Sequence, residues 1–148
     1  MDVAKLQRGE YIAIAGGALL LAGLFLPWYT TKLGRINGVA GPQSGWEVHP
    51  ILRYVLLVAA VAPLVLAYII LRDHALSWPR GELTAVIAIA CVGLLLYNGL
   101  IAQPGTSNDL TSLRLGWVVA VLGTLFMLFG AALRSSTSER KRKPPGTL

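Results

Sequence analysis

Few side chains in this sequence could do chemistry, and those that could do not form a recognised motif. Glu47, His49 and Asp109 are candidate zinc ligands, because carboxylate and imidazole groups both bind this metal. Their spacing follows no metal-ligand pattern, so we expect no metal site and no bound cofactor. Cys91 is the single cysteine; it cannot form an intrachain disulfide and is interpreted as a small apolar residue.

Catalytic combinations of residues are also missing. The long apolar stretches of the chain contain no serine, histidine or carboxylate, so an intramembrane hydrolase would lack its nucleophile and its base. The chain contains neither a phosphate-binding loop nor a dinucleotide-binding motif. We therefore do not expect an enzyme.

Four stretches without any charged residue determine the expected architecture, since each is close to the ~20 residues that cross a bilayer. The composition agrees, because 55% of the residues are hydrophobic and 14% are charged, against about 25% charged in soluble domains. We predict an all-α integral membrane four-helix bundle over residues 1–134 and a disordered basic tail over 135–148. The predicted spans are residues 11–29, 54–71, 83–102 and 115–133.

The positions of the basic residues predict how the bundle is oriented. With the N-terminus in the cytoplasm, nine basic residues lie inside and four outside, which favours both termini in the cytoplasm. The nine are Lys5, Arg8, Arg72, Arg80, Arg134, Arg140, Lys141, Arg142 and Lys143, and the four are Lys32, Arg35, Arg53 and Arg114. Orientation explains this charge without a nucleic acid partner. The tail run Arg140, Lys141, Arg142 and Lys143 is also expected to contact anionic lipid headgroups.

Small residues recur at helical spacing in the first and last spans. Such residues let two helix backbones approach closely in a membrane. We interpret both series as packing seams, either inside the bundle or, as the alternative, toward a second protein. The positions are Gly16 and Gly23 in the first span, and Gly116, Ala120, Gly123 and Gly130 in the last.

The first outer loop carries the residues that we place nearest to function. Trp28 closes the first span and Trp46 lies shortly before the second, so both are expected at the outer interface. They either fold the loop over the bundle as one cap or act as separate interfacial anchors. Glu47 is expected to lie close to Arg53 or Arg114. The glycine-rich loop shows no clean strand alternation, so we predict no strand in it.

Two motifs carry a resemblance to known proteins. The Leu-Pro-Trp end of the first span and the run Ser44-Gly45-Trp46-Glu47 resemble small uncharacterised four-span membrane proteins of actinobacteria, which imply no activity. Claudin-type proteins also have a long first outer loop with a Gly-Leu-Trp sequence, but they add two cysteines that this chain lacks. We further expect this loop to be too short for an outer sheet, so we do not infer homology to claudins.

These observations predict a non-enzymatic scaffold or accessory subunit of the plasma membrane. It would act through helix packing and its first outer loop, with membrane lipid and a membrane-protein partner, or a second copy of itself, as its contacts. The alternative is a small transporter or channel component whose path forms on oligomerisation.

The predicted orientation can be tested by labelling cysteines in intact cells. A membrane-impermeant maleimide should react with Ser107→Cys, in the second outer loop, and not with Ser136→Cys, in the tail. Labelling of Ser136→Cys but not of Ser107→Cys would reverse the orientation.

Overall fold

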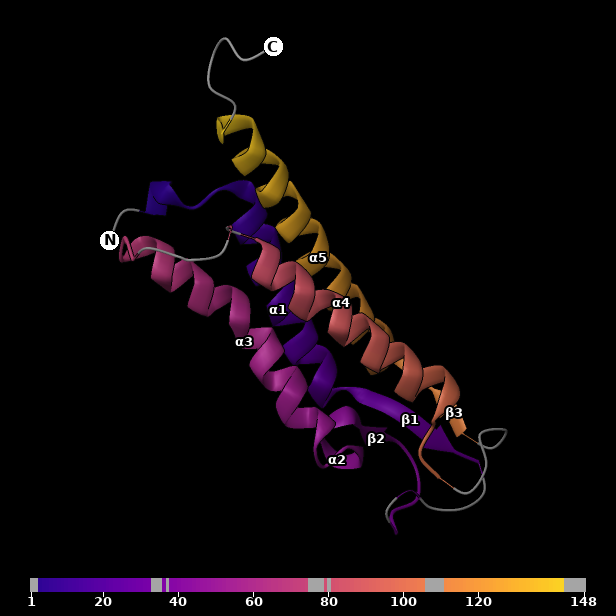
Figure 1. Ribbon diagram of the computed structural model, residues 1–148. Helices are drawn as coiled ribbons and strands as arrows, with labels where there is room; N and C mark the ends of the chain where they lie inside the picture. Colours follow the sequence, from indigo (N-terminus) through magenta and orange to yellow (C-terminus); the bar gives the residue numbers. More distant parts are fainter. Residues whose placement is uncertain are drawn as a thin grey trace.

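Four long helices and a small sheet make up the fold (Figure 1). The computed structural model describes residues 3–32, 36, 38–74, 79, 81–105 and 111–142, with the backbone alone for residue 3 and residues 137–142. In chain order the elements are η1 (Val3–Lys5), α1 (Arg8–Phe25), β1 (Pro27–Thr31), β2 (Gln43–Ser44), α2 (Gly45–Val48), α3 (Leu52–Leu71), α4 (Glu82–Leu96), the π-helix η2 (Tyr97–Ile101), β3 (Thr111–Leu113) and α5 (Leu115–Arg142).

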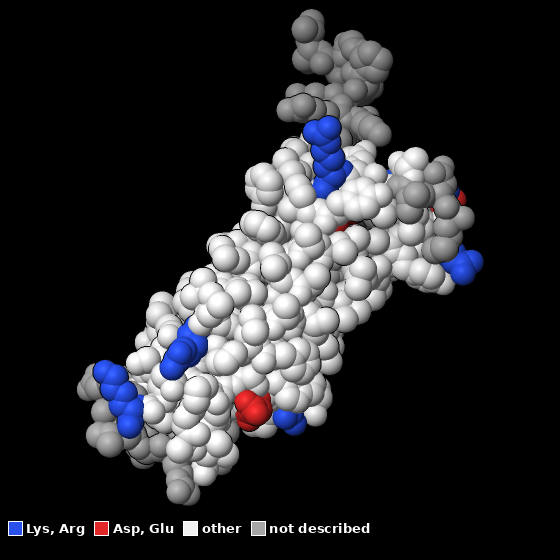
Figure 2. Space-filling view, turned by 180° about the vertical axis from the view of Figure 1, so that it is seen from behind, with Lys and Arg blue, Asp and Glu red and all other residues white. Residues whose placement is uncertain are grey.

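The four helices predicted to be long enough to cross a membrane are confirmed. They are α1, α3, α4 together with η2, and α5, and all four are apolar enough to span a bilayer. Large apolar side chains are exposed along them, which suits a lipid surrounding. Lys and Arg side chains lie toward both ends of the molecule and leave an uncharged middle (Figure 2). The structure is thus compatible with a multi-pass membrane protein.

The two ends of the bundle differ. One end carries β1, β2, β3 and α2, and we call it the sheet end; the other holds the first described residues and the end of α5, and we call it the terminal end (Figure 1). The prediction of a purely helical fold is wrong in this respect, because β1 pairs antiparallel with both β2 and β3. The loop between α1 and α3 is therefore long enough to take part in a sheet, contrary to the prediction.

Pro27 explains why the first helix is shorter than predicted. A residue before proline is held in the extended region, and Leu26 has φ −79° and ψ 157°. Helix α1 accordingly ends at Phe25, and the chain continues as β1 instead of remaining helical to Tyr29. Tyr29 pairs with Gln43 on one side and with Leu113 on the other.

Helices α1 and α5 pack with their backbones in direct contact. A Cβ atom added to Gly16 would lie 2.6 Å from the carbonyl oxygen of Gly123, and one added to Gly23 would lie 2.6 Å from the backbone nitrogen of Ala120. At the two ends, a Cβ on Gly116 would lie 2.5 Å from the Leu26 oxygen, and one on Gly130 would lie 2.6 Å from the Ala13 nitrogen. The two predicted seams therefore face each other inside the bundle.

Helices α3 and α4 flank this central pair. Gly17 of α1 faces the Ala60 carbonyl and the ring of Pro63 in α3. On the other flank, the Trp117 indole of α5 lies against Gly99 and donates a hydrogen bond to the Leu95 oxygen at 2.8 Å. Each outer helix is thus held by its own partner in the central pair.

A buried ion pair closes the seam at the terminal end. Arg134 Nε lies 2.7 Å from Glu10 Oε1, and the two side chains are 8% and 3% exposed. The second carboxylate oxygen accepts a hydrogen bond from the Gln7 backbone N–H at 2.5 Å. Charges buried to this degree persist when each is paired, so the two residues hold the helix ends together.

The C-terminal tail differs in part from the prediction. The sequence predicts disorder from residue 135, but the α5 backbone stays helical to Arg142. The side chains of Arg140, Lys141 and Arg142 and the whole of Lys143 lie outside the described residues. Their contact with lipid headgroups stays a prediction.

The central packing predicts opposite effects of one substitution at two glycines. In Gly123→Ala the new methyl group would meet the backbone of Gly16 and Leu20, which cannot move aside as a side chain can. We expect a loss of ~1–3 kcal/mol in the free energy of unfolding, the usual cost of overpacking. Gly93 of α4 is the matched control, because a methyl group there would have nothing within 4 Å and alanine favours helix by up to about 1 kcal/mol. Thermal unfolding in detergent that shows equal stability for the two variants would contradict this packing.

Candidate functional site

The candidate site is the cap, which we define as β1, β2, α2 and β3 with the side chains that fix them to the bundle. Trp28 of β1 is fully buried, and its indole N–H donates to the Gly23 oxygen at 2.6 Å. Gly45 of α2 lies against this ring, where a Cβ would be 2.6 Å from Trp28 Cδ2. The Leu-Pro-Trp and Ser-Gly-Trp-Glu motifs are therefore two sides of one contact. Trp28 is a core residue under the cap, so it is not a separate interfacial anchor. The level of the cap relative to a membrane stays a prediction.

Trp46 occupies a different position, on the flank where the cap meets the helices. Its ring stacks on Phe25 with centroids 5.2 Å apart and meets the Tyr54 ring edge-on at 5.8 Å. The Arg53 guanidinium lies 5.2 Å from the centroid of Trp46 and 4.9 Å from that of Tyr54. Arg53 Nη1 also donates to the Trp46 carbonyl at 3.3 Å. We call Phe25, Trp46, Arg53 and Tyr54 the arginine–aromatic stack.

Glu47 does not pair with Arg53 or Arg114, and that prediction is wrong. Its carboxylate accepts hydrogen bonds from the Ser44 backbone N–H at 2.8 Å and from the Ser44 hydroxyl at 2.9 Å, which together cap α2. These bonds, the backbone one first, lower the pKa of Glu47. Arg114 is exposed and contributes its backbone N–H, which donates to the Trp28 oxygen at 2.7 Å.

The Tyr29 hydroxyl of β1 joins η2 to His49, the residue that ends α2. The Tyr29 hydroxyl donates to the Asn98 backbone oxygen at 3.0 Å and lies 3.0 Å from His49 Nε2. Because this hydroxyl has one proton, His49 supplies the hydrogen of the second bond from Nε2. The Trp28 and Tyr29 rings both meet the His49 ring edge-on, with centroids 5.7 Å away. Burial lowers the pKa of His49 and raises that of Tyr29.

This arrangement positions the cap and offers no reactive group. The Tyr29 hydroxyl is buried with its proton committed to a carbonyl, so it is a poor nucleophile. In the part of the chain that the structure describes, no three His, Cys, Asp or Glu side chains gather at one point. Asp109, the third candidate metal ligand, lies outside the described residues.

Sequence reasoning misses the roles of Tyr29, His49 and Gly45. The absence of charge assigns Tyr29 to the apolar span, although Pro27 marks the helix end two residues earlier. Gly45 beside Trp46 could have been read as a site of close packing, because a glycine often marks a close approach of the backbone to another group. His49 offers no local signal, since its partners Tyr29 and Asn98 are brought to it only by the fold.

Comparison of the chain with protein-family models, with curated proteins and with solved structures finds no match. The resemblance to four-span actinobacterial proteins therefore stays a prediction.

The buried His49 predicts that acid weakens the cap. A histidine whose pKa is lower in the folded state than the usual ~6.5 binds fewer protons when folded. Its contribution to stability is complete above pH ~6.5 and is lost as the pH falls from there toward the lowered pKa. We expect the Tm of the wild type in detergent to fall between about pH 6.5 and pH 5. His49→Gln, which keeps a donor for Tyr29 but does not titrate, should lose less over that range. Equal losses in the two proteins would exclude His49 as the titrating group.

Proposed function

We propose that this chain is a non-enzymatic membrane scaffold or accessory subunit that contacts another membrane protein through its cap. In this proposal both termini lie in the cytoplasm and the cap lies outside the cell membrane. The orientation is supported by the sequence positions of the basic residues, nine in the segments predicted to lie inside against four in those predicted to lie outside. The small-residue seams are used between α1 and α5, so the partner surface is sought elsewhere.

The arginine–aromatic stack is the observation that carries the proposal. Tryptophan, tyrosine and arginine are the residues most enriched at the energetic centres of protein interfaces. Here they are held in one pre-formed arrangement, because Arg53 is bonded to the Trp46 carbonyl and lies over two rings. Ile51, two residues before Arg53 in the sequence, is 77% exposed and adds apolar surface next to the stack.

The position of the stack indicates what kind of partner it would meet. Phe25 is the last residue of α1, and Arg53 and Tyr54 belong to the first turn of α3. The stack therefore lies at the level where the membrane-length helices give way to the cap. Aromatic residues at this level suit the lipid headgroup region, so a partner that reaches them is itself a membrane protein or a second copy of this chain.

A transporter or channel component remains the alternative. Within one described chain its support is weak, because the backbone contact of α1 with α5 closes the centre of the bundle. The buried charges Glu10 and Arg134 neutralise each other and do not line a path. The alternative therefore requires a path between copies.

Site-specific photo-cross-linking in intact membranes tests the proposal. A photoreactive amino acid at Ile51, beside the stack, should give one discrete adduct larger than the monomer. The same group at Ile89 of α4 is the control, because Ile89 is comparably exposed, at 60%, and distant from the cap. Adding Arg53→Ala should reduce the Ile51 adduct by about tenfold, the ~1.4 kcal/mol typical of an interface arginine. An adduct of twice the monomer mass indicates a homo-oligomer. The cap would be refuted as the contact surface by equal adduct yields at Ile51 and Ile89. An Ile51 adduct yield that Arg53→Ala leaves unchanged would refute it too.

A further inference from the structure

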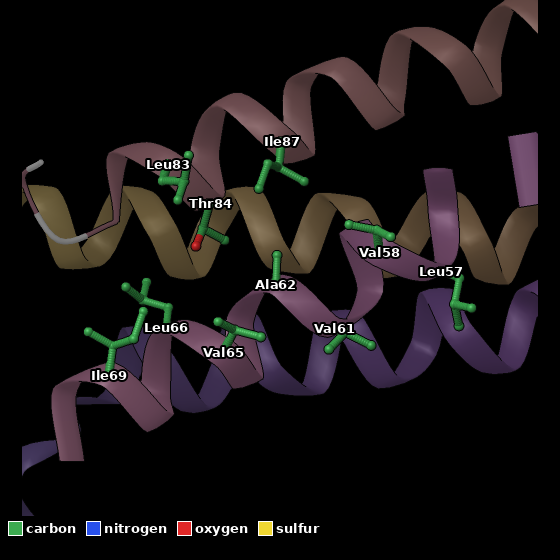
Figure 3. A pocket seen from close by; sticks show the side chains of 10 residues that line it. All are labelled: Leu57, Val58, Val61, Ala62, Val65, Leu66, Ile69, Leu83, Thr84 and Ile87. Atoms are coloured by element: carbon green, nitrogen blue, oxygen red, sulfur yellow. The ribbon is translucent and has the colours of Figure 1, made fainter. Parts of the chain in front are cut away.

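An apolar groove of about 470 Å³ lies between α3 and α4. Figure 3 shows side chains of the two helices facing each other across it, with the other two long helices behind. Of the ten lining residues only Thr84 carries a polar side-chain group. The lining residues are Leu57, Val58, Val61, Ala62, Val65, Leu66, Ile69, Leu83, Thr84 and Ile87.

The groove follows from the way the outer helices are held. α3 is anchored on α1 where Gly17 faces Ala60, and α4 is anchored on α5 through Trp117. Neither contact joins α3 to α4, so the groove between them is available to a molecule other than this chain. Because both helices are of membrane length and apolar, that occupant must be apolar too.

The length of the groove favours a lipid chain over a helix. Its α3 wall runs from Leu57 to Ile69, a rise of about 18 Å at ~1.5 Å per residue. One leaflet supplies about half of a ~30 Å hydrocarbon core. The groove thus matches the depth of one leaflet, whereas a spanning helix needs a surface along the whole core.

The guanidinium of Arg72 lies at the end of α3 where the headgroup of such a lipid would be. Val65, Ile69 and Arg72 follow at spacings of four and three residues, so Arg72 continues the lining face of α3 beyond the groove. The Arg72 guanidinium lies 5.4 Å from the Tyr68 ring centroid. Between described side chains the ion pairs are Lys5–Asp73 and Glu10–Arg134, which leaves Arg72 without a carboxylate partner among them.

We infer that the groove binds one acyl chain of an anionic phospholipid whose phosphate pairs with Arg72. The lipid belongs to the leaflet at the terminal end, because Arg72 follows the last residue of α3. The apolar walls take any chain of sufficient length, and Arg72 supplies the preference for a negative headgroup. The inference stands independently of the cap and its partner.

Native mass spectrometry of the full chain in mild detergent tests this site. Phosphatidylglycerol and phosphatidylcholine with identical chains are added separately. We expect one phosphatidylglycerol per chain in the wild type. Ala62→Trp, which fills the groove, should lower the bound fraction at least tenfold. Val118→Trp on an exposed face of α5 is the control and should leave it unchanged.

The headgroup contact is tested by a second pair of variants. Arg72→Gln should reduce the preference for phosphatidylglycerol over phosphatidylcholine about fivefold, the equivalent of ~1 kcal/mol per basic residue. Arg114→Gln, exposed at the sheet end, should not change it. Val65→Phe repeats the groove block in case Ala62→Trp unfolds the chain.

Three outcomes would overturn the inference. Groove-blocking variants that retain lipid at the wild-type level place the lipid elsewhere. A headgroup preference that Arg72→Gln leaves unchanged would exclude the contact between Arg72 and the phosphate. A lipid-free dimer that Ala62→Trp dissociates would show that a second copy fills the groove.

Discussion

Backbone contact between α1 and α5 is the constraint on which the rest of this structure depends. Glycine at positions 16, 23, 123 and 130 removes the side chains that would keep the two helices a full diameter apart. In a bilayer this matters more than in water, because lipid removes most of the hydrophobic drive and leaves close packing to hold helices together. The seam also reaches the cap, since Gly116 lies against the carbonyl groups of Leu26 and Pro27, where β1 begins.

The two ends of this seam are closed by different contacts. At the terminal end, Glu10 and Arg134 bury opposite charges against each other. At the sheet end, the Trp28 indole donates to the Gly23 carbonyl oxygen at 2.6 Å, in addition to the Leu26 backbone N–H that caps the helix there. The first contact neutralises two buried charges, and the second gives a buried indole N–H its acceptor. Each therefore suits a bundle whose ends lie close to a membrane surface.

Charge-free stretches and small-residue spacing are sufficient to predict the four helices and the residues of the seam. The same spacing continues beyond the residues named for the last span, because Arg134 lies four residues after Gly130. The sheet cannot be predicted this way. β1 is apolar enough to merge with the preceding span, and β2 and β3 are too short to show alternation. The partners of Glu47 and His49 cannot be predicted this way either. Glu47 bonds Ser44 in a local helix cap instead of a nearby arginine, and His49 bonds Tyr29, which is distant in the sequence.

The close central pair also accounts for the two surfaces to which roles are assigned. Because α1 and α5 each hold one outer helix, α3 and α4 are set by different partners and need not meet along their length, which leaves the apolar groove between them. The cap is fixed to two of the four long helices rather than through the groove. Trp28 bonds Gly23 of α1, and Tyr29 bonds Asn98 of η2, which continues α4. A lipid that enters or leaves between α3 and α4 therefore need not disturb the arginine–aromatic stack. The fold thus allows a lipid contact in one leaflet and a protein contact at the cap to vary independently.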